Sequence, residues 1–405
     1  MNKKISLGSA LILTSAAVLL TFMVTFVHIG RNFNRMMADT DLQHRIMLKL
    51  SELDGIARNL FIGEIDDQKL LESIADGFVR GLGDRFAEFM PAARYLEHLR
   101  LTQGRMVGIG VEVIFSDYRG GVIEVTHVSE ESPAEAGGML VGDYIYKVEG
   151  ERVADLGYFE SISKVRGAVG TDVLLTVLRK PEGAYTREEK ELIFTRAEVR
   201  VQTVRHELMR GDVGYIRIRE FNQETPNEFK AAVDELLGLG AAGFIFDVRN
   251  NGGGDLQGIT QTLDFLLPPG PIIRIYSGAS GENVIHSHGG SRLTAPMVVL
   301  MNERTASAAE LFCAALKDYE KATLVGVTTF GKGTVQSIHR LSDNSAVKLS
   351  TAIYSPPFSD NYDGIGVTPH IEVRLSEEAN RTPIERLAPE EDLQLLEALR
   401  ILERN

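Results

Sequence analysis

The chain has 405 residues, with 43 Lys or Arg against 56 Asp or Glu, which gives a net charge of −13 at neutral pH. This acidic balance argues against a nucleic-acid partner for the protein as a whole. The composition, 44% hydrophobic and 24% charged, is that of a folded globular protein, and the length allows roughly two or three domains. The single cysteine, Cys313, excludes an internal disulfide framework and a multi-cysteine zinc site.

The amino terminus contains a run of 23 residues, from position 5 to position 27, without a charged side chain. At about 1.5 Å per residue such a helix would span a hydrocarbon core of about 30 Å. A cleaved signal peptide is the alternative, but its apolar region would be shorter, and the small residues at 15–17 fall inside the run. We therefore expect residues 1–30 to form an uncleaved signal anchor. Basic residues flank both ends of the run, so charge alone does not fix its orientation.

The rest of the chain divides into four stretches of different periodicity. Residues 31–104 carry apolar side chains at spacings of three and four, which predicts a helical arm. Residues 105–195 change to short strands with Gly and Asp turns, which predicts a small, mostly β module. In residues 196–373, apolar strands alternate with helical stretches, as in an α/β core. Residues 374–405 end in a predicted amphipathic helix with leucines at every third residue.

The β module opens with Gly108-Ile109-Gly110-Val111 before a strand. Such a turn exposes backbone N–H groups that can receive a peptide carboxylate, and the strand edge can accept an added strand. The segments Ser132 to Met139 and Val141 to Ile145 follow in an order that resembles a PDZ domain. Arg166, before the turn at Gly170, could reach a peptide or the neighbouring domain, although a solvated arginine is an equally good interpretation.

The first chemical motif of the core follows the apolar strand 243–248, where Arg249-Asn250-Asn251 runs into three consecutive glycines at 252–254. Glycines let the backbone approach another group closely and direct N–H donors at it, as an oxyanion site requires. A flexible turn that leaves a strand would have the same composition. The spacing alone leaves both interpretations open.

The second motif follows the strand 297–301 and contains Ala306-Ser307-Ala308 before a predicted helix. The helix dipole at that position favours developing negative charge, and unpaired N–H groups can stabilise an oxyanion, so Ser307 is a candidate nucleophile. A serine before a helix is more often an N-cap.

The third motif, Gly326 to Gln336, nearly spells a phosphate-binding loop, but Gly333 stands in place of the hydroxyl that would bind a metal. We therefore reject nucleotide binding. Lys332 lies between two glycines and, if desolvated, could take a proton from a serine. Gln336 would contact Lys332 if the chain turned helically there, whereas in an extended strand the two would be about 13 Å apart.

Three other candidates have weaker support. His286 and His288 could share a strand face, but no third metal ligand is evident nearby. Ser161-Ile162-Ser163-Lys164 matches a Ser-x-x-Lys signature but lies inside the β module, without its accompanying motifs. His339 could in principle serve Ser307 as the base of a triad.

Taken in order, these pieces resemble the C-terminal processing peptidases, also called tail-specific proteases. The combination of Ala306-Ser307-Ala308 with Thr329-Phe330-Gly331-Lys332-Gly333-Thr334-Val335-Gln336 carries the resemblance, together with the PDZ-like module and Asn250-Asn251-Gly252-Gly253. It covers most of the chain beyond the anchor. The resemblance implies an α/β protease core, a mixed sheet with flanking helices, into which a PDZ domain is inserted, with helical arms at both ends that form a homodimer.

The resemblance also implies the roles of single residues. Ser307 would be the nucleophile of a serine endopeptidase, Lys332 its general base, and Gln336 the residue that orients the lysine. The backbone N–H groups of Ala308 and Gly253 would form the oxyanion hole. The PDZ domain would bind substrate carboxyl termini and gate the site, and the catalytic part would lie outside the cytoplasm of a cell membrane. No metal or cofactor is needed.

This sequence departs from the family pattern at three places. Gly252 stands where proline is common, which loosens the turn that carries the proposed oxyanion donor. Arg304-Thr305 replaces the usual Gly-Ser before the nucleophile, and Arg85 follows Gly83-Asp84 where proline is common. None of these changes removes a catalytic side chain. The alternative from another class is a PDZ adaptor that binds protein carboxyl termini without cleaving them.

Overall fold

The computed structural model describes residues 41–403, except 117, 182, 211, 279–280 and 291–292. The predicted signal anchor, residues 1–30, lies outside the described residues. Within the described part of the chain, no helix is both long enough and apolar enough to cross a bilayer. The chain divides into two compact parts, residues 1–75 and 76–405.

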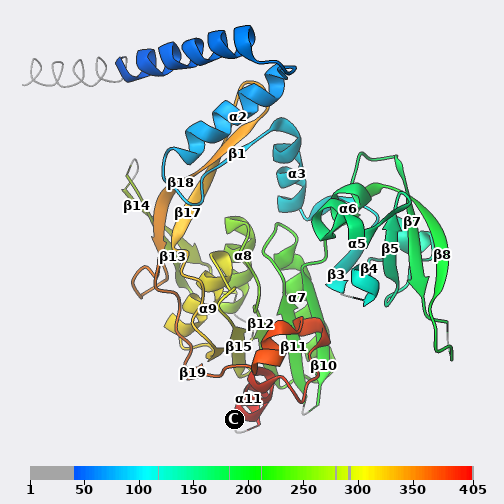
Figure 1. The fold of residues 1–405 in the computed structure, drawn as a ribbon. Coiled ribbons are helices and arrows are strands. Elements are labelled where there is room, and N and C mark those ends of the chain that lie inside the picture. The colour runs from blue at the N-terminus through cyan, green and yellow to red at the C-terminus, as the bar shows by residue number, and fades with distance from the viewer. Residues whose placement is uncertain are drawn as a thin grey trace, which may run out of the picture. The chain divides into compact units, whose positions relative to one another are not determined.

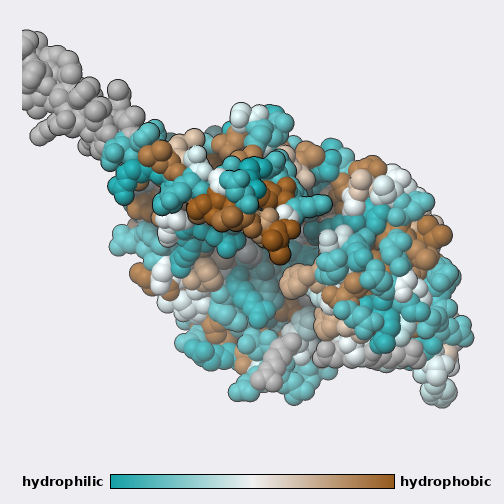
Figure 2. Space-filling model, turned by 45° about the horizontal axis from the view of Figure 1, so that its top comes forward, coloured by the Kyte–Doolittle hydropathy of each residue, from teal (hydrophilic) through white to brown (hydrophobic). Residues whose placement is uncertain are grey.

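The first part is helical where it is described. Residues 41–60 form one helix, and α2 (Asp67–Arg80) begins after a short turn. The Arg58 guanidinium contacts the carboxylates of Asp54 and Asp67 at 2.9 and 2.7 Å, which ties the end of the first helix to the start of the second. Many apolar side chains of residues 41–60 are exposed, including Met47 at 67% and Leu60 at 74%. Figure 2 shows that apolar, brown side chains are also exposed on the face of the molecule in that view.

The core of the second part is a six-stranded mixed sheet, here called the core sheet, in the order β10-β11-β12-β15-β16-β19. Its strands are β10 (Val204–Met209), β11 (Val213–Ile218), β12 (Gly243–Asp247), β15 (Met297–Met301), β16 (Thr323–Gly326) and β19 (Ile371–Glu372). All neighbours from β11 onward are parallel, and β10 is antiparallel to β11. The predicted strands at 243–248 and 297–301 are confirmed as β12 and β15.

Helices cover both faces of the core sheet (Figure 1). Side chains alternate along each strand. Phe244 and Phe246 of β12 therefore pack with α7 (Thr225–Gly238), α8 (Leu256–Leu266) and α9 (Ala308–Asp318) on one face. On the other face, Ile245 packs with α11 (Leu393–Leu402), the predicted closing helix. The predicted α/β class of the core is confirmed.

A second, five-stranded antiparallel sheet flanks the core and includes a strand from the predicted helical arm. It contains β1 (Glu88–Met90), β13 (Gly270–Ser277), β14 (Gly281–Ser287), β17 (Thr334–Arg340) and β18 (Ala346–Ser355). β1 pairs with β18, so residues 31–104 are not helical throughout; α3 (Ala92–Thr102) follows β1. The periodicity could not indicate this strand because its partner lies more than 250 residues away in the sequence.

The β module is an antiparallel sheet with short helices and a hydrophobic core of its own. Its strands are β3 (Val111–Ser116), β4 (Val122–Val128), β5 (Tyr144–Val148), β6 (Glu151–Arg152), β7 (Asp172–Arg179) and β8 (Glu188–Thr195). Its short helices are α4 (Pro133–Ala136), α5 (Val153–Leu156) and α6 (Tyr158–Val165), with the turn η1 (Tyr118–Gly120). Two paired strands, β2 (Arg105–Gly108) and β9 (Ala197–Arg200), carry the chain into the module and out of it. The remaining elements are α10 (Glu377–Arg381) and η2 (Ile384–Arg386).

Candidate active site

The candidate residues of the core lie on three loops that leave neighbouring parallel strands at the same edge. Loop 248–255 follows β12, loop 302–307 follows β15, and loop 327–333 follows β16. Because the carboxyl ends of parallel strands meet at one edge of a sheet, this edge is where open α/β sheets bind ligands. The three separate sequence motifs thus come together in one place.

Reciprocal hydrogen bonds join the first two loops. The Asn302 amide group donates to Asn250 Oδ1 at 2.8 Å, and the Asn250 backbone N–H donates to Asn302 Oδ1 at 2.9 Å. The Ala306 backbone N–H donates to the Asn251 carbonyl at 2.9 Å. These bonds place Gly253 directly against the candidate nucleophile: a Cβ added to Gly253 would lie 2.8 Å from Ser307 Cβ and 3.0 Å from the Ala308 nitrogen. A φ of +103° and this lack of space explain why a glycine stands here.

Ser307 occupies an unusual backbone position directly before α9. Its φ is 54° and its ψ is −117°, in a region that residues with a side chain rarely adopt. Such strain persists only where the surrounding structure fixes it, and it is frequent at catalytic positions. Ala308 is the first residue of α9, so its N–H has no partner within the helix. The geometry therefore presents a hydroxyl and an unpaired N–H group side by side.

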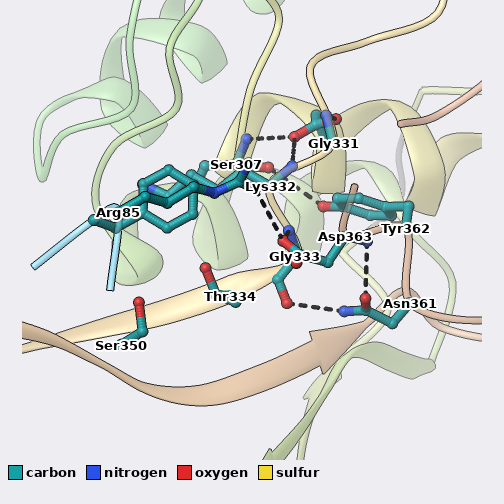
Figure 3. Close-up of polar contacts among 12 residues, drawn as sticks. Arg85, Ser307, Gly331, Lys332, Gly333, Thr334, Ser350, Asn361, Tyr362 and Asp363 are labelled. Carbon is teal, nitrogen blue, oxygen red and sulfur yellow. Dashed lines mark hydrogen bonds and ion pairs between the residues drawn. The ribbon is translucent and has the colours of Figure 1, made fainter. Parts of the chain in front are cut away.

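Lys332 lies on the third loop, with a half-buried side chain (Figure 3). Its Nζ atom lies over the ring of Phe86, 4.6 Å from the centroid, and the Arg85 guanidinium lies 4.5 Å from the same ring. Burial lowers the pKa of Lys332, and the positive charges of Lys348 and Arg85 lower it further, against the opposite effect of Glu310 and Asp84. A lysine in this setting loses its proton at a lower pH than a solvated one.

Asp84 fixes the turn that brings Phe86 and Arg85 to this lysine. Its carboxylate accepts hydrogen bonds from the Phe86 backbone N–H at 2.9 Å and from the Ser350 backbone N–H at 2.8 Å. Ser350 belongs to β18, so the turn before β1 is attached to the second sheet at this point. In the sequence, Arg85 stands out only as a departure from a family pattern, and no local signal indicates its place beside Lys332.

Glu310, which closes the Ala306-Ser307-Ala308-Ala309-Glu310 motif, is a buried residue of the site to which the sequence alone assigned no role. Its carboxylate accepts hydrogen bonds from the backbone N–H groups of Ser307 and Lys332, both at 2.8 Å. It also accepts from Gly331 N–H at 2.6 Å and from the Thr329 hydroxyl at 2.5 Å. The only signal in the sequence was its place three residues after Ser307, which also fits an ordinary capping box.

Two buried tyrosines contact the same segments from the carbonyl side. The Tyr354 hydroxyl donates to the Lys332 carbonyl at 3.0 Å and accepts from the Tyr362 hydroxyl at 2.6 Å, and the Tyr362 oxygen lies 3.4 Å from the Ser307 carbonyl oxygen. Burial raises the pKa of both phenols, so they remain protonated donors. Figure 3 shows Tyr362 on the side of Ser307 and Lys332 opposite Arg85.

The structure does not bring every predicted residue into contact. Gln336 lies on the extended strand β17, and its amide nitrogen donates to the Thr334 hydroxyl at 2.9 Å and the Thr334 carbonyl at 3.2 Å. Of the two conformations considered for the segment after Lys332, helical or extended, the structure has the extended one. The Gly253 N–H, assigned to the oxyanion hole, donates to Asn251 Oδ1 at 2.8 Å. His339 is exposed near the end of β17.

The weaker candidates occupy structural positions. The hydroxyl of Ser161 donates to the Gly157 carbonyl at 2.7 Å, and Lys164 pairs with Glu151. His288 contacts Asp264, and among the described residues no group of three or more His, Cys, Asp or Glu side chains is arranged to hold a metal ion. Cys313 is fully buried on α9, and burial raises the pKa of its thiol.

The predicted peptide site of the β module opens onto a cavity of about 1000 Å³. Residues Gly108 to Val113 line one side and Tyr158, Ile162, Val165 and Arg166 of the α6 region line another. Asn250 and residues 302–304 of the core loops line the same cavity. A Cβ on Gly110 would lie 2.3 Å from Ser132 Cβ, and its φ is +82°, so the turn requires glycine here. The Arg166 guanidinium donates to Glu97 of α3 at 3.0 Å.

Comparison with known proteins identifies the family. The sequence profile of peptidase family S41 matches residues 212–373, and that of a PDZ domain matches residues 124–179. A carboxy-terminal processing protease, CtpA, of Bacillus subtilis is 32% identical over 332 residues, which cover 82% of this chain and 70% of that protein. A carboxy-terminal-processing protease of Bartonella bacilliformis is 29% identical, over 82% of this chain and 75% of that protein.

A solved structure shows the same fold. An S41 protease structure from Bacteroides fragilis superposes with a TM-score of 0.58 at 18% identity, and the match covers 81% of this chain and 90% of that one. The expected resemblance to the C-terminal processing peptidases is therefore confirmed, as is the combination of a protease core with a PDZ domain. The chain belongs to peptidase family S41 and is a serine-type peptidase with a PDZ domain, of the carboxy-terminal processing group.

Proposed function

We propose that this protein is a membrane-anchored, extracytoplasmic endopeptidase that recognises substrate carboxyl termini with its β module and cleaves peptide bonds with Ser307 and Lys332. The observation that supports this most directly is the position of Ser307. It has a positive φ at the start of α9, and its backbone N–H is bonded to the same carboxylate as that of Lys332. A nucleophile and a partly desolvated amine are thereby held on adjoining loops.

The proposed reaction is an acyl transfer. Neutral Lys332 Nζ takes the proton of Ser307 Oγ while Oγ forms a bond to the peptide carbonyl carbon. The C–N bond then breaks, and the leaving amine takes the proton from Lys332. Lys332 Nζ then takes a proton from water, whose oxygen forms a bond to the acyl carbon. The bond between the acyl carbon and Ser307 Oγ breaks, and Oγ receives the proton from Lys332. The lowered pKa of Lys332 supports this role because the base must be uncharged.

The oxyanion of the tetrahedral intermediate would be held by the N–H groups of Ala308 and Gly253. Ala308 contributes the unpaired N–H of a helix start. For Gly253 to contribute, the peptide between Gly252 and Gly253 must rotate away from Asn251 Oδ1. Two consecutive glycines permit this rotation at low cost. Gln336 would act on Lys332 only through a change in the segment 333–335.

The β module would bind the carboxyl terminus of a substrate. The Gly108 to Val111 turn would receive the carboxylate, and the chain would add to the edge of β3. The cavity shared with Asn250 and residues 302–304 would let the same polypeptide continue toward the protease loops. Arg166, at the rim of this cavity, would contribute positive charge once released from Glu97.

The amino-terminal part would anchor the protein and form a homodimer. The apolar run 5–27 has the length of a membrane span. The exposed apolar side chains of residues 41–60 favour pairing with a second copy of the same helix. Sedimentation of the full-length protein in detergent would test this part of the proposal, since a monomer at all concentrations would contradict the dimer.

Digestion of β-casein by the full-length protein, followed by mass spectrometry, tests the catalytic assignment. Wild type should cleave, whereas Ser307→Ala and Lys332→Ala should not, and His339→Ala should behave as wild type. The reaction is run with and without a peptide that has an apolar carboxyl terminus, so that a need for an occupied β module becomes visible. Cleavage by Lys332→Ala together with loss in His339→Ala would contradict the proposed base. Peptide binding without any cleavage would favour the adaptor function.

A further inference from the structure

Glu310 makes more contacts than a helix cap requires. It is fully buried at the third position of α9, yet its carboxylate has four hydrogen-bond donors, two at each oxygen. A capping box needs only the bond to the N-cap N–H, here that of Ser307. The other three donors belong to residues 329–332, on a different loop. The carboxylate therefore joins two loops of the site.

The distribution of donors between the two oxygens is specific. Oε2 accepts from the backbone N–H groups of Ser307 and Lys332, so a single atom bridges these two residues. Oε1 accepts from Thr329 and Gly331, which fixes the loop that leads to the lysine. An ionised carboxylate can accept in this way at both oxygens, whereas an amide can accept at only one.

Tyr354 and Tyr362 lie against the same two residues at their carbonyl groups. Ser307 and Lys332 are therefore joined through a carboxylate at their N–H groups, and a hydrogen-bonded phenol pair packs against their carbonyls. The carboxylate bridge and the packed phenols together restrict the separation of the two backbones. The side chains of both residues are thereby restricted in position as well.

We propose that Glu310 is a positioning residue of the protease. It fixes the backbone of the Ser307 nucleophile relative to the backbone of the Lys332 base. The inference rests on the proposed roles of Ser307 and Lys332. In this role Glu310 contacts neither the substrate nor the reacting atoms. It affects catalysis by fixing the positions of Ser307 and Lys332, and misplacement of a reacting group by about 1 Å can lower the rate about 10²-fold.

Glu310 also acts on Lys332 by its charge. Four charged groups from three elements face this lysine: Lys348 of β18, Glu310 of α9, and Arg85 and Asp84 of the turn before β1. The negative charge of Glu310 raises the pKa of Lys332 against the lowering by burial, Lys348 and Arg85. Replacing Glu310 with a neutral residue therefore moves the pH at which the lysine loses its proton downward.

Glu228 offers a matched control elsewhere in the same domain. It lies on α7, largely buried, and its Oε2 accepts from the backbone N–H groups of Thr203 and Val204 at 2.8 and 3.1 Å. It also accepts from the Thr203 hydroxyl at 2.9 Å. The donors at Oε2 are of the same kind as those of Glu310, but they belong to neither Ser307 nor Lys332, and Oε1 lies 3.3 Å from the Arg200 guanidinium.

The experiment compares Glu310→Gln with Glu228→Gln in the full-length protein. Cleavage of a fluorogenic peptide derived from a β-casein cleavage site is followed from pH 6 to pH 10, with Tm as the measure of stability. In Glu310→Gln, whichever way the amide turns, its NH₂ group faces donors. We expect kcat to fall about 100-fold with KM changed less than about twofold, and the rising limb of the pH profile to move to lower pH. Glu228→Gln should lower Tm to a similar extent and leave kcat and the pH profile unchanged.

A second pair keeps the test available if Glu310→Gln does not fold. Thr329→Val removes one donor to Glu310 without changing the size of the side chain, and Thr203→Val does the same at Glu228. Thr329→Val should lower kcat about fivefold at unchanged KM. Thr203→Val should change only Tm.

Equal kcat values and equal pH profiles in Glu310→Gln and Glu228→Gln would overturn the inference, because Glu310 would then be a structural cap and no more. The same holds for equal kcat values in Thr329→Val and Thr203→Val. Failure of the proposed function looks different: Ser307→Ala or Lys332→Ala, measured in the same series, would keep the wild-type rate.

Discussion

The β module and the protease core build their sites in opposite ways. In the module, the proposed peptide site is made of backbone groups, the turn at Gly108 to Val111 and β3, the end strand of its sheet, and these residues are neighbours in the sequence. In the core, three loops contribute, and buried polar side chains such as Asn250, Asn302 and Glu310 hold them together. A backbone site depends on local conformation, whereas a site assembled from loops depends on every bond between them.

The largest expected effect is the loss of the proposed base. Lys332→Ala should lower kcat about 10³-fold or more, because Ser307 would have no group to take its proton. Binding of a fluorescent apolar peptide to the β module should not change, since the module does not contact this side chain. Fluorescence anisotropy beside the casein assay checks both statements. If Lys332→Ala lost peptide binding as well as cleavage, the peptide site of the β module and the protease site would not be separate.

A smaller effect is expected from the carbonyl side of the core site. Tyr362→Phe removes the hydroxyl that lies between Tyr354 and the Ser307 carbonyl. A net hydrogen-bond contribution of about 1 kcal/mol predicts a fall in kcat of about fivefold. Tyr319→Phe, which removes a phenol bonded to the Pro271 carbonyl, is the control and should leave kcat unchanged. A Tyr362→Phe enzyme with the wild-type kcat would mean that the Glu310 bridge suffices.

The module should respond to a change in its backbone. Gly110→Ala places a Cβ where φ is +82° and Ser132 Cβ would be 2.3 Å away, so the turn must distort. We expect the affinity for the apolar peptide to fall about tenfold, by anisotropy. Gly142→Ala, also at positive φ but with no atom within 4 Å of the added Cβ, separates the effect of strain from that of the clash. Equal affinities in wild type and Gly110→Ala would contradict the proposed location of the site.

The smallest effect is a shift of the pH profile. Lys348 lowers the pKa of Lys332, so Lys348→Gln should raise that pKa and move the rising limb of activity toward higher pH. The shift opposes the one expected for Glu310→Gln. Lys230→Gln, at an exposed position of α7 away from the site, serves as a control for the change in net charge. An unchanged limb in Lys348→Gln would show that another group governs it.

Sequence patterns indicated the parts of the site that repeat over short distances. The strand 297–301, the helix start at Ala308 and the glycine turn after β12 lie where expected, because periodicity and glycines are local signals. The roles of Ser307 and Lys332 came from the order of motifs in a family and not from spacing. Both remain proposals for this chain.

The remaining parts depend on contacts between distant residues. In the sequence, Glu310 looks like an ordinary glutamate in the first turn of a helix. Its contacts with loop 327–333 are visible only in the structure. Tyr354 and Tyr362 carry no sequence signal at all, and β1 pairs with a strand more than 250 residues away in the sequence. The ambiguity at Gln336, helical or extended, was settled by the pairing of β17 with β18. Tertiary packing determines these contacts between distant residues, and the local pattern of a single sequence does not indicate them.

The β2–β9 ribbon has a consequence for how this protein could have been assembled from parts. The chain leaves the core at Arg105 and returns at Arg200, and these two residues are paired across the ribbon. The Val201 N–H also donates to the Gly104 carbonyl, so the two ends of the inserted segment lie next to each other. A segment with adjoining ends can be gained, lost or exchanged by a single recombination event without displacing the elements on either side. A different recognition domain could therefore be inserted between the same two residues of the core.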